Sequence, residues 1–357
     1  MKSGSGPESE RSKLQSAIAD FPPAYFSMVM ATGIVSIASH LLDIPLVSVA
    51  LFGLNIVCYI VLWIFTCARI FIYPRRFFDD LKDHFKGVGV FTIVAGSCVL
   101  GSQFVILMNA FKPATALLTV GIVSWGLLIY FIFTLFTVSA EKPSIASGIN
   151  GVWLVSIVAT QSISILSCLI VSHFPGFETL ILFFSLCMFL VGGMLYFLII
   201  TLIFYRFMFF SLKPEALGPP YWINMGAVAI STLAGASLVL NSDKAALLQV
   251  LLPFITGVTV LFWAVATWWI PYLLLLGAWR YMIGRIKFTY DPQYWGMVFP
   301  LGMYTTCTFQ LAKAIHLDFL LKIPRVFIYA AFLAWGLTFF GLLKLLVRSL
   351  FSHGNAS

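Results

Sequence analysis

Apolar residues run through this chain in long blocks, broken at intervals by short polar, proline-rich or glycine-rich segments. A helix that crosses about 30 Å of hydrocarbon needs roughly 20 mostly apolar residues, and the blocks are of that length. Because lipid offers no hydrogen-bond partners, each block must satisfy its own backbone as an α-helix. The pattern therefore predicts an all-α polytopic membrane protein with ten transmembrane helices, near residues 22–41, 46–70, 88–109, 114–138, 150–171, 179–205, 221–241, 247–279, 294–316 and 325–347.

The composition is that of a chain that lies almost wholly in the bilayer. Hydrophobic residues make up 61% of the 357 positions and charged residues 10%, and the mean hydropathy is +1.01. We expect a cytoplasmic disordered tail over 1–20, a ten-helix transmembrane domain over 21–349 and a cytoplasmic tail over 350–357. The first 20 residues lack the order of charge, apolar run and small residues that marks a secretory signal peptide.

The basic residues predict how the chain is oriented. Of the 21 Lys and Arg residues, 16 fall in the tails and loops on the side that holds both termini. Basic loop residues stay preferentially in the cytoplasm, so we expect both termini there and the protein in the plasma or bacterial inner membrane. A basic cytoplasmic face also concentrates anions, and the sequence has no nucleic-acid-binding motif to explain the charge otherwise.

Several predicted helices begin with the same kind of residues. Proline precedes, and small residues follow, an aromatic pair at Tyr25–Phe26, Tyr221–Trp222 and Tyr294–Trp295. A weaker version of the motif begins at Asn150. All of these open odd-numbered segments, which indicates a repeated two-helix hairpin and odd helices that run parallel.

Odd and even segments also differ in side-chain size. Gly, Ala, Ser and Thr make up more than a third of the odd segments and about a quarter of the even ones. Small residues suit close helix contact or an open lumen, whereas bulky ones suit lipid, so we expect the odd helices to form an inner ring. Bulky residues of the sixth and eighth segments are expected to face lipid or another subunit, namely Phe183, Phe184, Phe189, Trp263, Trp268 and Trp269.

The small and hydroxyl residues of the odd segments are candidates to line a pore. They are Thr32, Gly33, Ser36, Gly101, Ser102, Thr160, Ser164, Ser231, Gly235, Gly302 and Thr306. The alternative for each residue is ordinary helix packing, in which a serine or threonine hydroxyl bonds back to its own helix.

The middle of all ten segments is free of Asp, Glu, Lys, Arg and His. Proton pumps and many ion-coupled carriers keep such groups at mid-membrane, so the chain offers no proton relay. It has no HExxH, GxSxG or phosphate-binding glycine loop, and its six cysteines are scattered. We therefore expect no enzyme, no cofactor and no metal site. Positive helix N-termini without acidic rings favour small anions as the substrate.

The motifs resemble those of a known family. PPAYFSMVMATGI, NGVWLVSIVATQS, PPYWINMGAVAI, FWAVATWWIPYLLLLGAWR and YWGMVFPLGMYT are similar to motifs of the tellurite-resistance/dicarboxylate transporter family, which includes the plant slow anion channel. The resemblance spans about residues 21–348. It implies five hairpins around a central pore, usually in a homotrimer whose subunits each have a pore.

The resemblance also implies a gate at Phe299, where family members close the pore with a phenylalanine. Pro300 follows it, and a proline there lacks the backbone donor and crowds the carbonyl of Gly296, so we expect a kink. Three readings remain open: an anion channel, a secondary carrier for a malate-like dicarboxylate, sulfite or tellurite-type oxyanion, and a scaffold or sensor with a vestigial pore.

Overall fold

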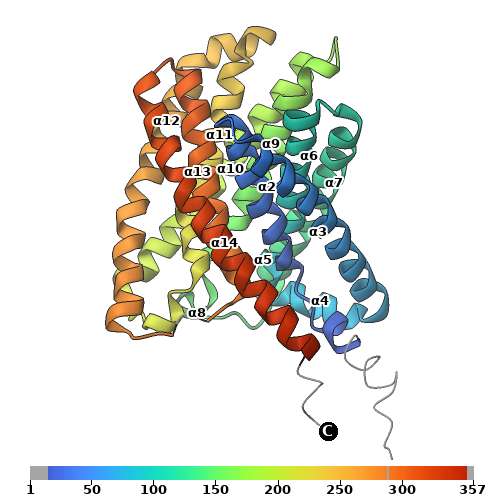
Figure 1. Ribbon diagram of the computed structural model, residues 1–357, viewed down its shortest axis with the longest axis vertical. Helices are drawn as coiled ribbons and strands as arrows, with labels where there is room; N and C mark the ends of the chain where they lie inside the picture. Colours follow the sequence, from blue (N-terminus) through green and yellow to red (C-terminus); the bar gives the residue numbers. More distant parts are fainter. Residues whose placement is uncertain (1–14, 288, 352–357) are drawn as a thin grey trace, which may run out of the picture.

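The computed structural model describes residues 15–287 and 289–351 as a bundle of long helices, without a strand in those ranges (Figure 1). The long helices are α2 (Phe26–Leu41), α3 (Pro45–Ile72), α6 (Thr92–Met108), α7 (Phe111–Val138), α9 (Val155–Ile170), α10 (Glu178–Phe209), α11 (Ile223–Leu240), α12 (Ala246–Ala278), α13 (Trp295–Ala314) and α14 (Lys322–Phe351). The all-α polytopic membrane fold is confirmed.

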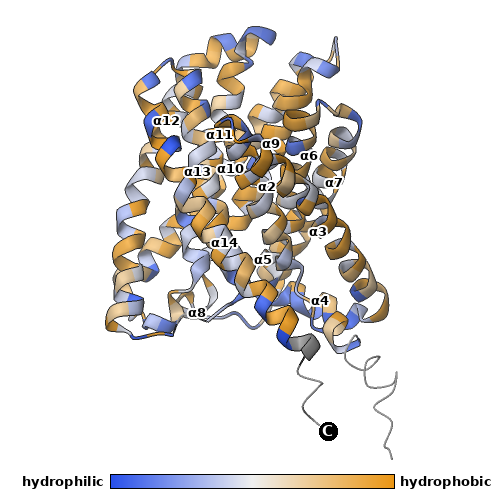
Figure 2. Cartoon of the chain, viewed as in Figure 1, coloured by the Kyte–Doolittle hydropathy of each residue, from blue (hydrophilic) through white to orange (hydrophobic). Residues whose placement is uncertain are grey.

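Nine helical segments in the described part of the chain are long and apolar enough to cross a membrane. The other long helix, α13, has 20 residues but is more polar, since it carries Gln310, Lys313 and three threonines. A crossing by α13, and hence the total of ten, stays a prediction. Figure 2 shows hydrophobic residues along the helices and hydrophilic residues gathered toward the two ends of the bundle.

The repeated sequence motif corresponds to a repeated helix start. Short 3₁₀ helices lead into α2, α9, α11 and α13, and the short α5 (Lys86–Gly89) leads into α6. The 3₁₀ helices are η1 (Pro23–Tyr25), η2 (Gly151–Leu154), η5 (Pro219–Trp222) and η8 (Pro292–Tyr294). Proline suits a first turn because its missing N–H would have no partner there and its φ is already helical.

Burial divides the long helices into two classes. In the segments that contain α2, α6, α9 and α11, between 72 and 94% of the most apolar stretch is buried. The corresponding share for α3, α7, α10, α12 and α14 is 22 to 50%. The helix α13 belongs with the buried class, since 15 of its 20 residues are buried. The odd segments are therefore inside and the even ones outside, as their side-chain sizes predict.

The buried helices close into a ring. Contacts run from α2 to α6, α9, α11 and α13 in turn, and from α13 back to α2. Each outer helix packs on the ring helix before it in the chain and also on the next helix of the ring, which for α14 is α2. The same hairpin packing is thus repeated five times around one axis.

One end of the bundle carries the start of α2, the end of α14 and the short amphipathic helix α4 (Pro74–Lys82) (Figure 1). Residues 15–19, from the predicted tail, are helical, and Ala19 is buried. The rest of that tail and residues 352–357 lie outside the described residues.

The expectation for the sixth and eighth segments needs a correction. In the sixth, Phe183 is exposed, but Phe189 of α10 is buried and its ring meets Phe262 of α12 edge-on.

The eighth segment shows the same division. Trp268 is 52% exposed, but its neighbour Trp269 is buried and donates a hydrogen bond from Nε1 to the Tyr196 hydroxyl of α10 at 3.0 Å. Trp263 donates to the Thr308 hydroxyl of α13 at 3.0 Å. A tryptophan on an outer helix can turn inward because its indole N–H finds an acceptor there.

Candidate functional site

The first turns of all five ring helices enclose a cavity of about 270 Å³, here called the N-terminal cavity. Its lining includes one residue from the start of each ring helix, namely Ser27, Thr92, Val155, Ile223 and Gly296. The cavity therefore lies on the axis of the ring, at the end where the helix N-termini and their partial positive charges gather.

A second, smaller cavity of about 40 Å³ lies further along the same helices and is here called the C-terminal cavity. It is also lined by all five ring helices, through Ile34, Val99, Ser162, Ile230 and Met303 among others.

The two cavities share one face of every ring helix. On each helix, the residue in the C-terminal cavity comes seven positions after the residue in the N-terminal cavity, as in Gly296 and Met303. Seven residues are about two helical turns, or roughly 10 Å of rise. The cavities are therefore two sections of one axial path, and the quasi-equivalent helices meet it in the same register.

The turns between the two cavities form a buried section of the ring. Residues 28–33, 93–98, 156–161, 224–229 and 298–302 are all buried. Phe299 lies in this section and is 1% exposed. Phe299 comes three residues after Gly296 and four before Met303, on the same side of α13 as these two lining residues, but it lines neither cavity itself.

Pro300 lies next to Phe299 in the buried section and packs between two ring helices. It lies within the continuous helix α13 and packs on Gly226 of α11, where an added Cβ would come 2.7 Å from Pro300 Cγ. A larger residue at 226 would push α11 and α13 apart at the level of Phe299.

Among the eleven candidate lining residues, Ser102 and Thr306 line the C-terminal cavity. Four other hydroxyl residues bond to outer helices: Thr32 accepts from Trp335, Thr160 accepts from Trp125, Ser36 donates to the Ser48 carbonyl, and Ser164 bonds to Ser185. Ser231 donates to the Ala227 carbonyl of its own helix.

The four candidate glycines lie at helix contacts. Their missing side chains make room for neighbours as follows: Gly33 for Val99 and Asn55, Gly101 for Leu166, Gly235 for Thr259, and Gly302 for Ile34 and Val35. Each allows a neighbouring helix to approach closely.

Sequence reasoning did not single out Ser162 and Gln310, which line the C-terminal cavity, and gave Ser237 no special weight. A signal was available in the spacing 296, 303, 306 and 310 of α13, which keeps these lining residues on one face of the helix. The same stripe on α9 runs through 155, 162, 165 and 169.

The hydroxyl groups in the C-terminal cavity already donate hydrogen bonds within their own helices. Ser102, Ser162, Ser237 and Thr306 each donate to a backbone carbonyl three or four residues earlier on the same helix. A hydroxyl so engaged offers only lone pairs, so these four groups do not form a tight anion-binding site.

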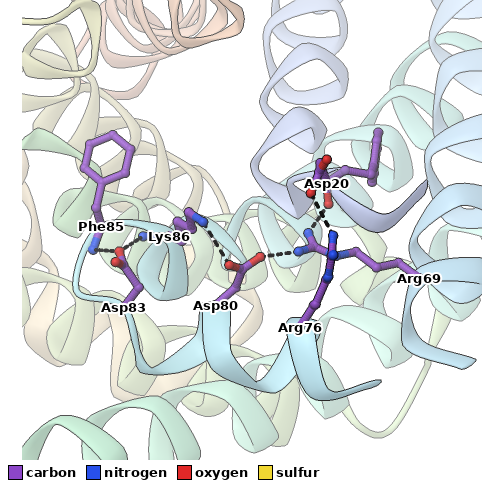
Figure 3. Close-up of polar contacts among 8 residues, drawn as sticks. Asp20, Arg69, Arg76, Asp80, Asp83, Phe85 and Lys86 are labelled. Atoms are coloured by element: carbon purple, nitrogen blue, oxygen red, sulfur yellow. Dashed lines mark hydrogen bonds and ion pairs between the residues drawn. The ribbon is translucent and has the colours of Figure 1, made fainter. Parts of the chain in front are cut away.

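The N-terminal cavity has charged residues in its wall: Asp80, Lys86 and Asp291 (Figure 3 shows the first two). Lys86 Nζ donates to Asp80 Oδ1 at 3.0 Å. Asp291 accepts from the backbone N–H of Gln293 at 2.8 Å and so caps η8.

Asp80 is also the partner of a buried cation. Arg69, which is 4% exposed, donates through its guanidinium to the Asp80 carboxylate and to the Phe21 carbonyl (Figure 3). A second ion pair joins Arg76 to Asp20 at 3.1 Å. These contacts hold α4 and the segment before α2 to the mouth of the ring.

His84 lies in the turn that follows α4, outside the membrane-spanning helices. Its ring stacks on Phe136 at a centroid distance of 4.1 Å. Partial burial lowers its pKa below the ordinary histidine value, Asp83 opposes this effect and Lys142 adds to it. In the described residues, His, Cys, Asp and Glu form no cluster of three that could hold a metal ion.

Comparisons with known proteins agree with this architecture. The sequence profile of the voltage-dependent anion channel family, SLAC1, matches residues 20–343. An uncharacterized transporter of Methanocaldococcus jannaschii is 26% identical over 336 residues, which cover 91% of this chain and 94% of the relative. A second from that organism is 24% identical over 327 residues, covering 90% and 92%. An uncharacterized membrane protein of Mycobacterium tuberculosis is 35% identical over 163 residues, covering 46% of this chain and 82% of the relative.

Proposed function

The chain belongs to the voltage-dependent anion channel family, and from this premise we propose that it conducts small anions through the centre of its five-helix ring. Phe299 is the proposed gate and Pro300 the residue that fixes the shape of α13 beside it. Membership of the anion channel family and the similarity to proteins named as transporters both support a transport function.

One observation carries the proposal. Two cavities lie on the same face of all five ring helices, and the buried section between them contains Phe299. A path that is present at both ends and closed in the middle is what a gated conduit requires. The described structure is then the closed state.

The electrostatics suit anions that pass without binding tightly. Parallel ring helices direct their N-termini at one mouth, which attracts negative charge. The buried section between the cavities has no Asp, Glu, Lys, Arg or His, and the hydroxyls of the C-terminal cavity are engaged with their own helices. An anion at the gate would meet the positive edge of an aromatic ring rather than a full charge, which favours throughput over affinity.

A second candidate function is a secondary carrier for a four-carbon dicarboxylate, sulfite or a tellurite-type oxyanion. The N-terminal cavity of about 270 Å³ has room for such an ion, and its wall holds the Lys86 ammonium beside the Asp80 and Asp291 carboxylates. A carrier would show saturable uptake that depends on a pH gradient and is absent for chloride.

Three further assignments belong to the proposal: both termini in the cytoplasm, residence in the plasma or bacterial inner membrane, and a homotrimer with one pore per subunit. The outer helices expose many large apolar residues, which either lipid or neighbouring subunits can cover.

The decisive experiment is reconstitution into liposomes with a panel of anions, comparing the wild type with Phe299→Ala. Enhanced flux of chloride and nitrate in the variant supports the gated channel. No flux from a folded, inserted Phe299→Ala protein would favour a scaffold or sensor and would overturn the proposal.

A further inference from the structure

A large cavity away from the ring axis is not used by the proposed transport path. It has a volume of about 460 Å³ and lies between the C-terminal half of α14, the first turns of α13 and the loop before them. The last turns of α14 and the start of α2 lie at the same end of the bundle (Figure 1), and their residues line this cavity and the N-terminal cavity respectively.

Two cations lie in the wall of this cavity. Lys344 and Arg348 both line it, and their spacing of four residues puts them on one face of α14. The lining contains no Asp or Glu. The four salt bridges found among the described residues do not involve either cation. The cavity therefore has a net positive wall without an internal counter-ion.

The opposite wall is built by close packing. Gly341 of α14 lies against the ring of Tyr290, since an added Cβ would come 2.5 Å from Tyr290 Cδ2. Thr289, next to Tyr290, is exposed and lines the cavity with a hydroxyl. Lys344 and Arg348 are exposed, and they share the cavity with the Thr289 hydroxyl, a hydrogen-bond donor.

Most of the remaining lining is apolar and continues toward the middle of the bundle. Leu337 and Phe340 line the cavity and are 56 and 65% exposed. They lie one to three turns before the cations, on a helix of which only 22% of the most apolar stretch is buried. This side of α14 therefore combines a charged end with an apolar flank on the outer surface of the bundle.

We propose that this cavity binds an anionic phospholipid. The phosphate pairs with Lys344 and Arg348, and the Thr289 hydroxyl donates to a phosphate oxygen. An acyl chain lies along Leu337 and Phe340, where it replaces water on exposed apolar surface. Basic pockets between membrane helices recognise anionic headgroups in this way, through charge at the interface and apolar contact below it.

A soluble phosphate anion has the same headgroup chemistry, but the observations favour a lipid. A free anion would use the cations and leave Leu337 and Phe340 exposed to water, whereas a lipid matches both halves of the surface. The inference does not depend on the channel assignment, because it concerns a cavity off the ring axis.

The test is native mass spectrometry of the full chain, titrated with phosphatidylglycerol or phosphatidylcholine. The test variant is Lys344→Gln/Arg348→Gln. The matched control is Lys322→Gln/Arg325→Gln, which removes two cations from the other end of the same helix. A charge-preserving variant, Lys344→Arg/Arg348→Lys, tests whether charge alone suffices.

We expect the wild type to retain phosphatidylglycerol in preference to phosphatidylcholine. Loss of both cations should weaken phosphatidylglycerol binding roughly 30-fold. Each basic residue contributes about 1 kcal/mol to the binding free energy, and the two contributions together correspond to this change in affinity. The control and the charge-preserving variant should bind like the wild type. Equal binding by the Lys344→Gln/Arg348→Gln variant, an equal loss in the control, or full displacement of the lipid by inorganic phosphate would each overturn the proposal.

Discussion

Trp125 of the outer helix α7 donates a hydrogen bond from its indole Nε1 to the Thr160 hydroxyl of the ring helix α9, at 2.8 Å. Two quasi-equivalent contacts occur elsewhere: Trp335 donates to Thr32 at 3.0 Å, and the Tyr59 hydroxyl bonds to Ser97 at 2.8 Å. Each hydroxyl comes five residues after a residue that lines the N-terminal cavity. The repeat therefore preserves a polar link from an outer helix to the ring.

Thr160→Val tests what this link contributes. Valine keeps the shape but leaves the Trp125 N–H without an acceptor, so we expect a loss of about 1 kcal/mol, within the range for hydrogen bonds between membrane helices. The free energy of unfolding in mixed micelles measures it. Thr201→Val is the control, because Thr201 is exposed and bonds its own helix. Equal losses in both variants would contradict a specific link.

Phe299→Ala separates a gate from an ordinary core residue. If the ring closes the path, its removal should raise anion flux about tenfold or more, which corresponds to a barrier lower by about 1.4 kcal/mol. Liposome efflux measures this. Phe91→Ala is a matched truncation, since Phe91 is also buried but packs toward Phe133 of α7. If both variants only lose stability, as core truncations do, Phe299 is not a gate.

Asp80→Asn should destabilise the mouth of the ring. It leaves the Arg69 guanidinium buried beside a neutral partner, and breaking a buried pair costs about 3 kcal/mol. Asp79→Asn breaks the neighbouring exposed pair with Lys82 and should cost less than about 1 kcal/mol. Unfolding free energies and proteolysis within α4 report the difference. Similar behaviour of the two variants would show that the Arg69 contact is unimportant.

The charges in the N-terminal cavity should tune anion flux in opposite directions. Asp291→Asn removes a negative charge but keeps an oxygen that can cap η8, so flux should rise about twofold to fivefold at low ionic strength. Lys86→Gln should lower it by a similar factor. Both effects should shrink at high salt. Asp243→Asn, in the exposed η6 (Ser242–Lys244) beyond α11, is the control; a salt-independent effect would argue against charge as the cause.

His84 should make the α4 end sensitive to acid. Its folded pKa is lowered, so the folded state binds protons less readily than the unfolded state. The stability it provides is present above the unfolded pKa of about 6.5 and is lost as the pH falls toward the folded pKa. Proteolysis of the α4 turn at pH 7.5 and 5.5 measures this. His84→Phe keeps a ring on Phe136 and should remove the pH dependence; an unchanged dependence would exclude His84 as its source.

The sequence by itself determined the helices and their two classes. Each span satisfies its own backbone in lipid, so length and hydropathy suffice to locate it, and the positions agree closely with α2 to α14. The proline and aromatic starts repeat because each first turn is a local structure. Small residues identified the buried class because helices can approach closely only where side chains are small.

Only the tertiary structure decided which face of each ring helix meets the axis. Thr32, Thr160 and Ser164 face outer helices, whereas Ser102 and Thr306 line the C-terminal cavity. Composition does not distinguish these positions, because a serine or threonine hydroxyl can donate to a carbonyl of its own helix whether it faces the axis or an outer helix. The rotation of a ring helix is set by partners distant in sequence, such as Trp335 for Thr32, and these contacts exist only after the bundle has assembled.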